Sequence, residues 1–275
     1  MTLTVTALAS GSSGNALLVR CGSDALLVDC GLPMRTLAGL LRYQGLELDQ
    51  LKAVLLTHEH GDHALSAAAL ARRYRVPIIC NAATRAALGD ELAGLPVEAL
   101  PVGELAALGA FEFRSFSVAH DAADPVGYRV SAAGASLAYA VDLGSWDATT
   151  VAALRGADLL IVEANHDREL LRAAPYPAPI RQRICGQRGH LDNIQCGELL
   201  AQAMPTTSTI WLAHLSAQSN SPKVASAGVR RVLDLAGLPK VLLSALPRRA
   251  AKGPSGAPTW RADEHATVQA NLFGE

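Results

Sequence analysis

Aromatic residues are scarce in this sequence, and no charge of one sign prevails. Phe, Tyr and Trp make up 4% of the 275 residues, so a buried core has to be built mostly from Ala, Leu and Val. The formal net charge is −1, so the chain is not basic throughout. Contact with a nucleic-acid backbone would need a local group of Lys and Arg. Four such groups occur, and each could equally be a solvated surface: Arg72, Arg73 and Arg75; Arg181, Arg183 and Arg188; Arg230 and Arg231; Arg248, Arg249 and Lys252.

Paired cysteines and long apolar runs are also missing. The five cysteines are odd in number and none has C-x-x-C spacing, which argues against a disulfide framework and a thiolate zinc finger. The N-terminus shows neither a basic segment nor an apolar stretch long enough for a signal peptide or a membrane span. We therefore expect a cytoplasmic protein that does not associate with a membrane.

The hydrophobic pattern predicts an α/β protein. Short apolar or alternating segments predict strands over residues 3–9, 16–20, 25–29, 51–57, 76–80, 111–118, 126–130, 136–141, 158–163, 209–212 and 241–243. Apolar residues three and four apart predict helices over residues 33–43, 64–74, 148–154, 179–186, 193–204 and 222–235, with Asp62 as N-cap of the second. The order strand, helix, strand over 51–80 predicts a parallel pair.

The composition shifts near the C-terminus. From about Pro247 onward Arg, Ala, Gly and Pro become frequent, and no clear apolar period continues. We therefore expect one catalytic domain over residues 1–247 and a flexible tail over residues 248–275.

Three imidazoles and a carboxylate fall within six residues of one loop. The segment His58-Glu59-His60-Gly61-Asp62-His63 follows a predicted strand and precedes a predicted helix. Imidazole nitrogen and carboxylate oxygen suit Zn²⁺, Mn²⁺ or Fe²⁺. Gly61 would permit the tight backbone that brings Asp62 and His63 round. A solvated His-rich turn is the alternative, but the density of donors favours a metal site.

Four donors in one loop cannot fill two metal sites, so further donors have to come from other loops. Candidates follow predicted strands or lie in loops: His120, Asp142, His190 and His214. Clustering of such side chains at strand ends is what a metal site on one rim of a sheet requires.

The H-x-H-x-D-H segment after a strand resembles the signature of the metallo-β-lactamase superfamily. The resemblance covers roughly residues 3–245 and implies a four-layer αββα sandwich with two divalent metal ions. It implies that one metal is held by His58, His60 and His120, and the other by Asp62, His63 and His214. It further implies that Asp142 bridges the two.

Other segments are similar to the YycJ/WalJ-like branch of that superfamily, whose members are regarded as 5′→3′ DNA exonucleases. They are residues 8–16, 28–31, 120–128, 163–167, 189–191, 214–216 and 220–222. Asp192 departs from the branch, which often has Ser after Gly-His-Leu, and places a negative charge near the expected phosphate pocket.

The resemblance leads to a mechanistic hypothesis. A hydroxide bridging two metals (Zn or Mn, with Fe as a further candidate) would attack a phosphodiester in line. Asp62 would orient this nucleophile, and His190 would donate a proton to the leaving oxygen. The opposite assignment, with His190 as ligand and His214 as acid, stays open, as does a purely structural His190.

Three further segments are candidates for contacts with the substrate, the ligands or a partner. Ser10, Ser12, Ser13 and Asn15 lie in a Gly-Ser loop whose backbone could approach a phosphate, although a plain hairpin is equally expected. Residues 165–167 are candidates for orienting the metal ligands. The segment Gln269–Phe273 resembles the short peptide by which bacterial repair proteins dock on the sliding clamp.

Two other functions remain open. A small-molecule phosphodiesterase or thioester hydrolase of the same fold would have a narrow pocket, whereas a nuclease acting on DNA would have a basic groove beside the metals. Convergence of Arg72, Arg181, Arg183 and Arg188 near His58 would favour the groove. A non-catalytic nucleic-acid-binding protein is the third reading, against which the full set of seven expected ligands argues.

Overall fold

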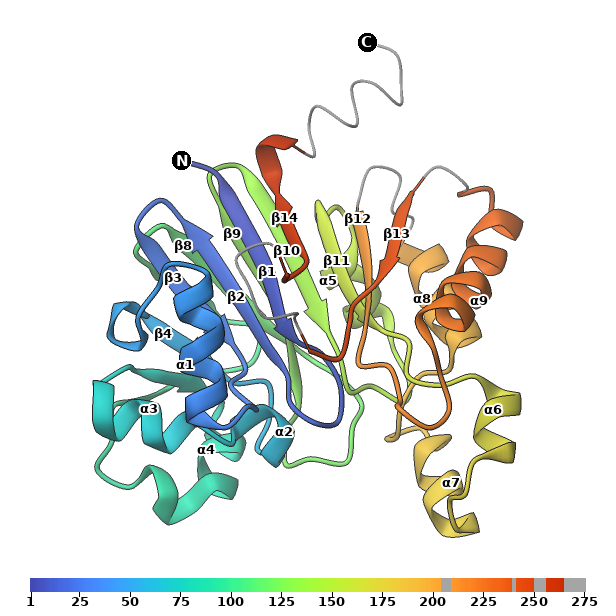
Figure 1. The fold of residues 1–275 in the computed structure, drawn as a ribbon, viewed down its shortest axis with the longest axis horizontal. Coiled ribbons are helices and arrows are strands. Elements are labelled where there is room, and N and C mark those ends of the chain that lie inside the picture. The colour runs from blue at the N-terminus through green and yellow to red at the C-terminus, as the bar shows by residue number, and fades with distance from the viewer. Residues whose placement is uncertain (204–208, 239–240, 250–255, 265–275) are drawn as a thin grey trace.

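The computed structural model describes residues 1–203, 209–238, 241–249 and 256–264. Within them the chain forms two seven-stranded sheets (Figure 1). The first has the order β14-β1-β2-β3-β4-β5-β6. Its strands are β14 (Thr259–Arg261), β1 (Leu3–Ala9), β2 (Ala16–Cys21), β3 (Asp24–Val28), β4 (Ala53–Leu55), β5 (Ile78–Cys80) and β6 (Val97–Ala99).

The second sheet has the order β13-β12-β11-β10-β9-β8-β7. Its strands are β13 (Leu242–Ala245), β12 (Thr209–Ala213), β11 (Leu159–Glu163), β10 (Ala135–Ala140), β9 (Val126–Ala132), β8 (Phe111–Ser117) and β7 (Leu105–Leu108). In each sheet four consecutive strands are parallel, β3 to β6 and β10 to β13. The predicted parallel pair is β4 and β5.

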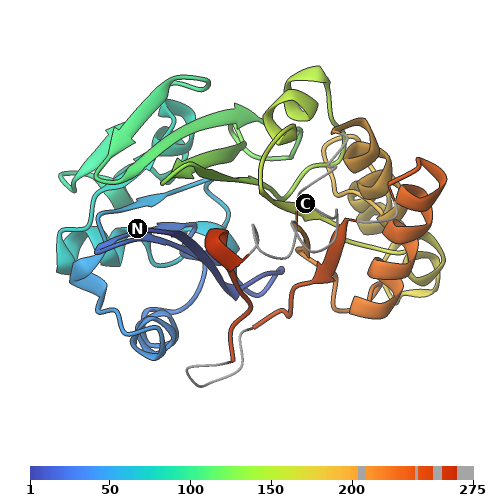
Figure 2. The same ribbon diagram turned by 90° about the horizontal axis from the view of Figure 1, so that it is seen from above.

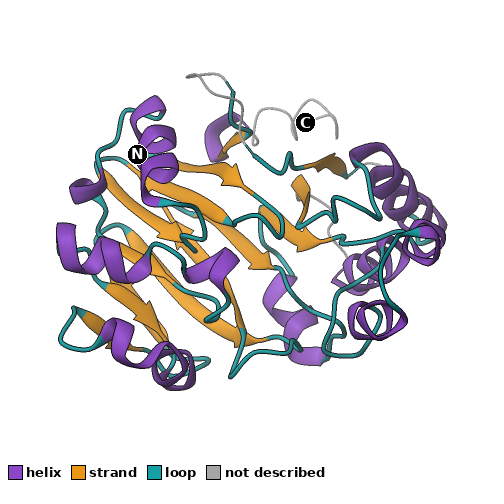
Figure 3. Ribbon diagram, turned by 60° about the horizontal axis from the view of Figure 1, so that its bottom comes forward, coloured by secondary structure: helices purple, strands orange, loops and turns teal. Residues whose placement is uncertain are grey.

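Helices cover the outer faces of both sheets, as Figures 2 and 3 show. On the first sheet they are α1 (Met34–Tyr43), α2 (Gly61–Ala64), α3 (Ala67–Tyr74) and α4 (Ala82–Leu88), with the short 3-10 helices η1 (Leu48–Gln50) and η2 (Gly89–Leu92). On the second they are α5 (Ala148–Leu154), α8 (Asn193–Ala203) and α9 (Pro222–Leu235), while α6 (Arg168–Ala173) and α7 (Ala178–Ile184) lie beyond the strand ends at the lower right of Figure 1. The four-layer αββα arrangement expected from the sequence is confirmed.

Three apolar clusters hold these layers together. The cluster between the sheets contains six of the seven buried aromatic side chains of the described residues: Phe111, Phe113, Tyr128, Tyr139, Trp211 and Trp260. The two outer clusters, under the helices of each sheet, are built mainly from Leu, Val and Ala. The buried aromatic residues are thus concentrated where the two sheets pack face to face.

The helix predicted over residues 64–74 is divided in two, and Asp62 is not its N-cap. His60 and Ser66 are the N-cap residues of α2 and α3. The break is imposed by the neighbouring loop, because the Ser66 backbone N–H donates to Cys30 O at 3.1 Å and the Ser66 hydroxyl donates to Leu32 O at 2.5 Å. Asp62 lies inside the first turn of α2, which frees its carboxylate for other contacts.

Part of the segment expected to be a tail belongs to the folded domain. β14 pairs antiparallel with β1, in the register Thr4 with Arg261 and Thr6 with Thr259. Trp260 on β14 is 5% exposed and packs in the cluster between the sheets. Residues 256–264 therefore belong to the folded domain, although the predicted domain boundary at residue 247 placed them in the tail. Among the described residues, no helix is long and apolar enough to cross a membrane.

Candidate metal centre

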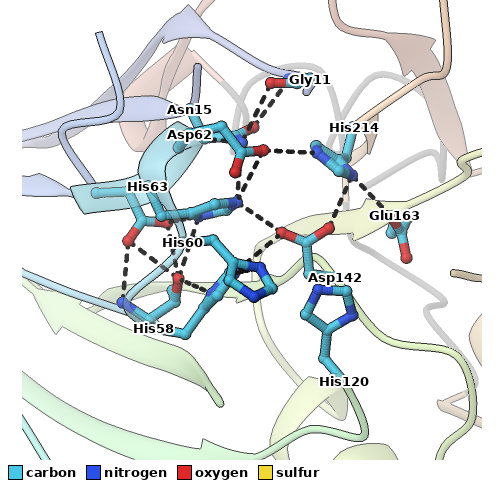
Figure 4. A network of polar contacts seen from close by, with 12 residues as sticks. Gly11, Asn15, His58, His60, Asp62, His63, His120, Asp142, Glu163 and His214 are labelled. Atoms are coloured by element: carbon cyan, nitrogen blue, oxygen red, sulfur yellow. Dashed lines mark hydrogen bonds and ion pairs between the residues drawn. The ribbon is translucent and has the colours of Figure 1, made fainter. Parts of the chain in front are cut away.

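Side chains that can bind metals meet at one rim of the two sheets, from elements far apart in the sequence (Figure 4). Four of them lie between β4 and the first turn of α2: His58, His60, Asp62 and His63. The other five come from the second sheet and its loops: His120 after β8, Asp142 after β10, Glu163 at the end of β11, His190 before α8 and His214 after β12. Since the carboxyl ends of parallel strands lie at the same edge of a sheet, the loops after β4, β10, β11 and β12 bring these donors together.

The first donor group consists of three imidazoles. His58, His60 and His120 each offer a nitrogen, and these nitrogens all lie within 4.8 Å of one another. His58 Nε2 is 3.1 Å from His60 Nδ1. Two nitrogens bound to one tetrahedral metal at 2.0–2.1 Å are about 3.3 Å apart. Burial lowers the pKa of His58 and of His120, so both rings are neutral and can ligate.

The second donor group mixes carboxylates and imidazoles. Asp62, His63, Asp142 and His214 offer atoms within 4.8 Å of one another. His63 Nε2 is 2.6 Å from Asp142 Oδ2, and His214 Nδ1 is 2.9 Å from Asp142 Oδ1. His214 Nε2 is buried and, among the described residues, has no hydrogen-bond partner. A buried nitrogen without a partner beside two carboxylates is what a metal would satisfy, so the residues fit such a group.

The two groups are adjacent and share a carboxylate. Asp142 Oδ2 lies 3.6 Å from His58 Nε2 of the first group and 2.6 Å from His63 Nε2 of the second. Asp142 is buried, and the positive charge on His214 and His63 overcomes its burial and holds its pKa well below the usual range. The carboxylate is therefore ionised and located between the two groups.

His190 lies beside the second group. Its Nδ1 is 2.8 Å from Glu163 Oε1 and 3.3 Å from Asp142 Oδ1, and the ring is partly exposed. Burial lowers its pKa, but Glu163 and Asp142 outweigh this and raise the pKa to about 9. Asp142, Glu163, His190 and His214 form a third set of atoms within 4.8 Å of one another, so the geometry permits His190 as ligand or as proton donor.

Two buried carboxylates that the sequence analysis did not assign complete the centre. Glu163 Oε1 contacts both His190 Nδ1 and His214 Nδ1 at 2.8 Å, and the charge on these rings outweighs its burial and lowers its pKa to about 2. Asp29 accepts a hydrogen bond from His63 Nδ1 at 2.7 Å and two from Thr57. The only signal for either residue was its position at a strand end within a motif of the resemblance.

Several residues of the rim have a left-handed backbone. Asp29, Asp142 and His214 have φ angles of 61°, 55° and 53°, although none is glycine. Each follows closely after a strand, β3, β10 or β12. Such a conformation costs on the order of 1–3 kcal/mol and concentrates at functional sites. In this protein the left-handed conformation turns the chain at the end of each strand, so that these three side chains point toward the donor groups.

The loop proposed to bind phosphate is partly committed to other contacts. Ser10 Oγ accepts a hydrogen bond from the His214 N–H at 2.8 Å, and Asn15 Nδ2 is 2.9 Å from His63 Nε2. Ser10 and Asn15 are buried, and these contacts support the two histidines. Ser12 and Ser13 are exposed.

The other motif residues have distinct places. Asn165 Nδ2 donates to His214 O at 3.0 Å, which makes Asn165 a support for this loop. Asp167 caps α6, and His166 is buried against Cys185. Asp192 is also buried. Its carboxylate accepts from two N–H groups of the first turn of α8 and pairs with Arg168 at 2.5 Å, so its charge is neutralised there.

Of the four arginines named as a test for a groove beside His58, two lie near its donor group and two do not. Arg183 pairs with Asp121 at 2.5 Å, and Arg188 donates to His120 O at 3.0 Å, which places both at the His120 loop. Arg181 lines a cavity between α6, α7 and α8, and Arg72 lies on α3. The segment Gln269–Phe273 lies outside the described residues.

This fold and this set of donors define a hydrolase of the metallo-β-lactamase fold, which implies binding of divalent metal. Residues 25–215 match the family model described as the β-lactamase superfamily domain, and the chain belongs to this family. It is 34% identical over 241 residues to the exodeoxyribonuclease YycJ of Bacillus anthracis, covering 86% of this chain and 91% of that protein. It is 33% identical over 224 residues to the exodeoxyribonuclease WalJ of Streptococcus pneumoniae, covering 79% and 83%.

Solved structures show the same fold. The metallo-β-lactamase fold protein YhfI from Bacillus subtilis superposes with a TM-score of 0.74 at 19% identity, covering 95% of this chain and 100% of that one. Zn²⁺-bound PqqB from Methylobacterium extorquens superposes with a TM-score of 0.67 at 16% identity, covering 94% and 99%.

Proposed function

We propose that this protein is a DNA exonuclease that works 5′→3′ and uses two divalent metal ions, Zn²⁺ or Mn²⁺, with Fe²⁺ as a further candidate. The observation that carries the proposal is the pair of adjacent donor groups joined by the Asp142 carboxylate. Two relatives at 33–34% identity are named exodeoxyribonucleases, and this supports DNA as the substrate. His58, His60 and His120 would hold one metal, and Asp62, His63 and His214 the other, with Asp142 between them.

The chemistry needs a nucleophile at neutral pH and stabilisation of charge on phosphorus, which divalent metals supply when bound. Asp62, which is partly exposed at the rim, would orient the attacking water through its carboxylate. Its Oδ2 is 3.6 Å from His214 Nε2 and 3.7 Å from His63 Nε2, which fixes the side chain toward the centre.

His190 would donate the proton that the leaving alkoxide needs. Its Nδ1 faces Glu163, and its Nε2 makes no hydrogen bond within the described part of the chain. An imidazole fixed by a carboxylate through one nitrogen presents the other nitrogen to a substrate in a defined direction.

The deciding experiment measures degradation of 5′-labelled and 3′-labelled DNA, single-stranded and double-stranded, by metal-free protein reconstituted with Zn²⁺ or Mn²⁺. RNA of the same sequence and a small chromogenic phosphodiester are assayed beside it. We expect stepwise release of nucleotides from the 5′ end, and its loss in Asp62→Ala. Metal analysis of both proteins distinguishes a failed reaction from a failed loading.

Other outcomes would redirect the proposal. Cleavage of only the small ester would assign the centre to a small-molecule phosphodiesterase. DNA binding without cleavage by fully loaded protein would favour a non-catalytic nucleic-acid-binding role. Release from the 3′ end would keep the nuclease and reverse its polarity.

A further inference from the structure

Four arginines line one cavity between α1 and α3, on the outer face of the first sheet. Arg35 and Arg42 lie on α1, and Arg72 and Arg73 lie on α3. The cavity has a volume of about 510 Å³, and Ala38, Ala69 and Tyr74 form part of its wall. We call this cavity the arginine groove. Arg35 and Arg42 are seven residues apart, so they lie on the same side of α1, two turns from each other.

The charge of the arginine groove is not neutralised. No acidic residue lines it, and none of its four arginines forms an ion pair with a carboxylate among the described residues. All four side chains are exposed. Arg72 donates only to the backbone oxygen of Glu91, at 3.3 Å, and the Arg73 guanidinium lies 5.4 Å from the centre of the Tyr74 ring.

Other arginines near the rim differ in this respect. Arg168 pairs with Asp192, and Arg183 pairs with Asp121. The chain as a whole has a formal net charge of −1, so a cluster of four unpaired cations is a local excess. Unpaired guanidinium groups around one cavity favour a ligand with several phosphates.

Both walls of the groove begin at the metal centre. α1 starts shortly after Asp29, and α3 starts shortly after His63. The segments before them are joined by hydrogen bonds from Cys30 N–H to His63 O at 2.8 Å and from the Ser66 hydroxyl to Leu32 O at 2.5 Å. Arg72 comes nine residues after His63, on the helix that follows the donor loop.

From this geometry we infer that the arginine groove binds the phosphodiester backbone of the nucleic acid, away from the phosphate being cleaved. The inference rests on the proposed function, because it names how a polymeric substrate is held at the same centre. Arginine contacts to phosphates carry no base preference. The groove should therefore raise the affinity for long nucleic acids, whatever their base sequence.

The test uses two groove variants, the double variant Arg35→Gln/Arg42→Gln and the single variant Arg72→Gln. The control is the double variant Lys223→Gln/Arg231→Gln. Lys223 and Arg231 are exposed on α9, over the other sheet, so the control removes the same charge elsewhere (Figure 1). Binding of a fluorescein-labelled long duplex is measured by anisotropy in metal-free buffer over a range of salt concentrations. Turnover of a dinucleotide and of a long duplex is then measured with metal-loaded protein.

We expect the groove variants to flatten the plot of log affinity against log salt by about one unit per arginine removed. KM for the long duplex should rise, while turnover of the dinucleotide and metal content stay unchanged. The control should keep the slope of the unaltered protein. Equal slopes in groove variants and control would overturn the inference, even if the protein degrades DNA. If the protein does not degrade DNA but the groove variants still lose salt-dependent binding, the proposed nuclease function is wrong, whereas the inference that the arginine groove binds nucleic acid is kept.

Discussion

The backbone oxygen of Asp62 occupies the place that a side chain on Gly31 would need. A Cβ on Gly31 would lie 1.7 Å from this oxygen, and 2.7 Å from the His63 nitrogen. The loop after β3 and the donor loop after β4 are therefore in direct backbone contact. This close approach positions two residues of the second donor group.

Gly31→Ala should displace the donor loop, because the backbone atoms opposite the new methyl group cannot be avoided by a side-chain rotation. A displacement of about 1 Å can cost on the order of a hundredfold in turnover. We expect reduced metal content and at least this loss of activity.

Gly61→Ala is the matched control within the H-x-H-x-D-H segment. Nothing lies within 4 Å of a Cβ at Gly61, and Gly61 does not have a positive φ. The expectation that its flexibility is needed for the loop is therefore wrong. Gly61→Ala should keep its metal and its melting temperature; equal damage in both variants would contradict the distinction.

Asp29→Asn should weaken one metal site more than the other. The Asp29 carboxylate accepts directly from His63 Nδ1, whereas it reaches the first donor group only indirectly among the described residues, through the Thr57 hydroxyl beside His58 Nδ1. Loss of a carboxylate that orients a ligating histidine typically costs about 10–100-fold in metal affinity. Titration of metal-free protein with Zn²⁺ should show one weakened and one unchanged binding event. Asp49→Asn, an exposed position in η1, should change neither.

His190→Ala should reduce kcat by about 10²–10⁴-fold while both metals remain bound, if His190 is the proton donor. The defect should shrink on a phosphodiester with a p-nitrophenolate leaving group, because this leaving group departs without a proton. Loss of metal from the variant would make His190 a ligand instead. An equal defect on both substrates would exclude proton donation.

Metal uptake by the metal-free protein should depend on pH differently at the two donor groups. Burial lowers the pKa of His63, but Asp29 and Asp142 outweigh it and raise the pKa to about 10. His63 must lose its proton to ligate, so affinity at the second group should rise with pH toward about 10. His58 and His120 have lowered pKa values and are already neutral, so the first group should bind with little pH dependence above neutrality. Calorimetry in buffers of different ionisation enthalpy would count the released protons; equal proton release at both groups would contradict this.

Trp260→Ala should destabilise the domain by about 3–5 kcal/mol, the usual cost of removing a buried aromatic side chain. Trp146→Ala is the control, since Trp146 is only partly buried, and it should cost less. Urea unfolding measures both. A loss at Trp260 smaller than that at Trp146 would show that β14 contributes little and would support a boundary at residue 247.

The metal-binding donors could be predicted best where several of them lie close together in the sequence. The H-x-H-x-D-H segment carries four donors in a single loop, and the parallel strands determine that the later donors arrive at the same rim. Glu163 and Asp29 were not assigned because a lone carboxylate at a strand end gains its role only from the histidines it meets in space. The break before α3 was missed for a related reason: residues 64–74 favour a continuous helix, and contacts with Cys30 and Leu32 interrupt it.

Short edge strands were also missed. β6, β7 and β14 have three or four residues each, which is too short for a period to be recognised in the sequence. β14 is held by pairing with β1 and by Trp260, neither of which a local window of sequence contains.

The pairing of β1 with β14 affects the order in which the chain can fold during synthesis. Thr4 leaves the ribosome well before its partner Arg261, because the two residues lie far apart in the sequence. The outer edge of β1 stays unpaired until β14 has emerged, and an open edge of this kind is a site for pairing with other chains. Every residue of the metal centre precedes β14, so the centre can assemble on a nascent chain whose first sheet is still open. We therefore expect chains truncated before residue 256 to aggregate during expression.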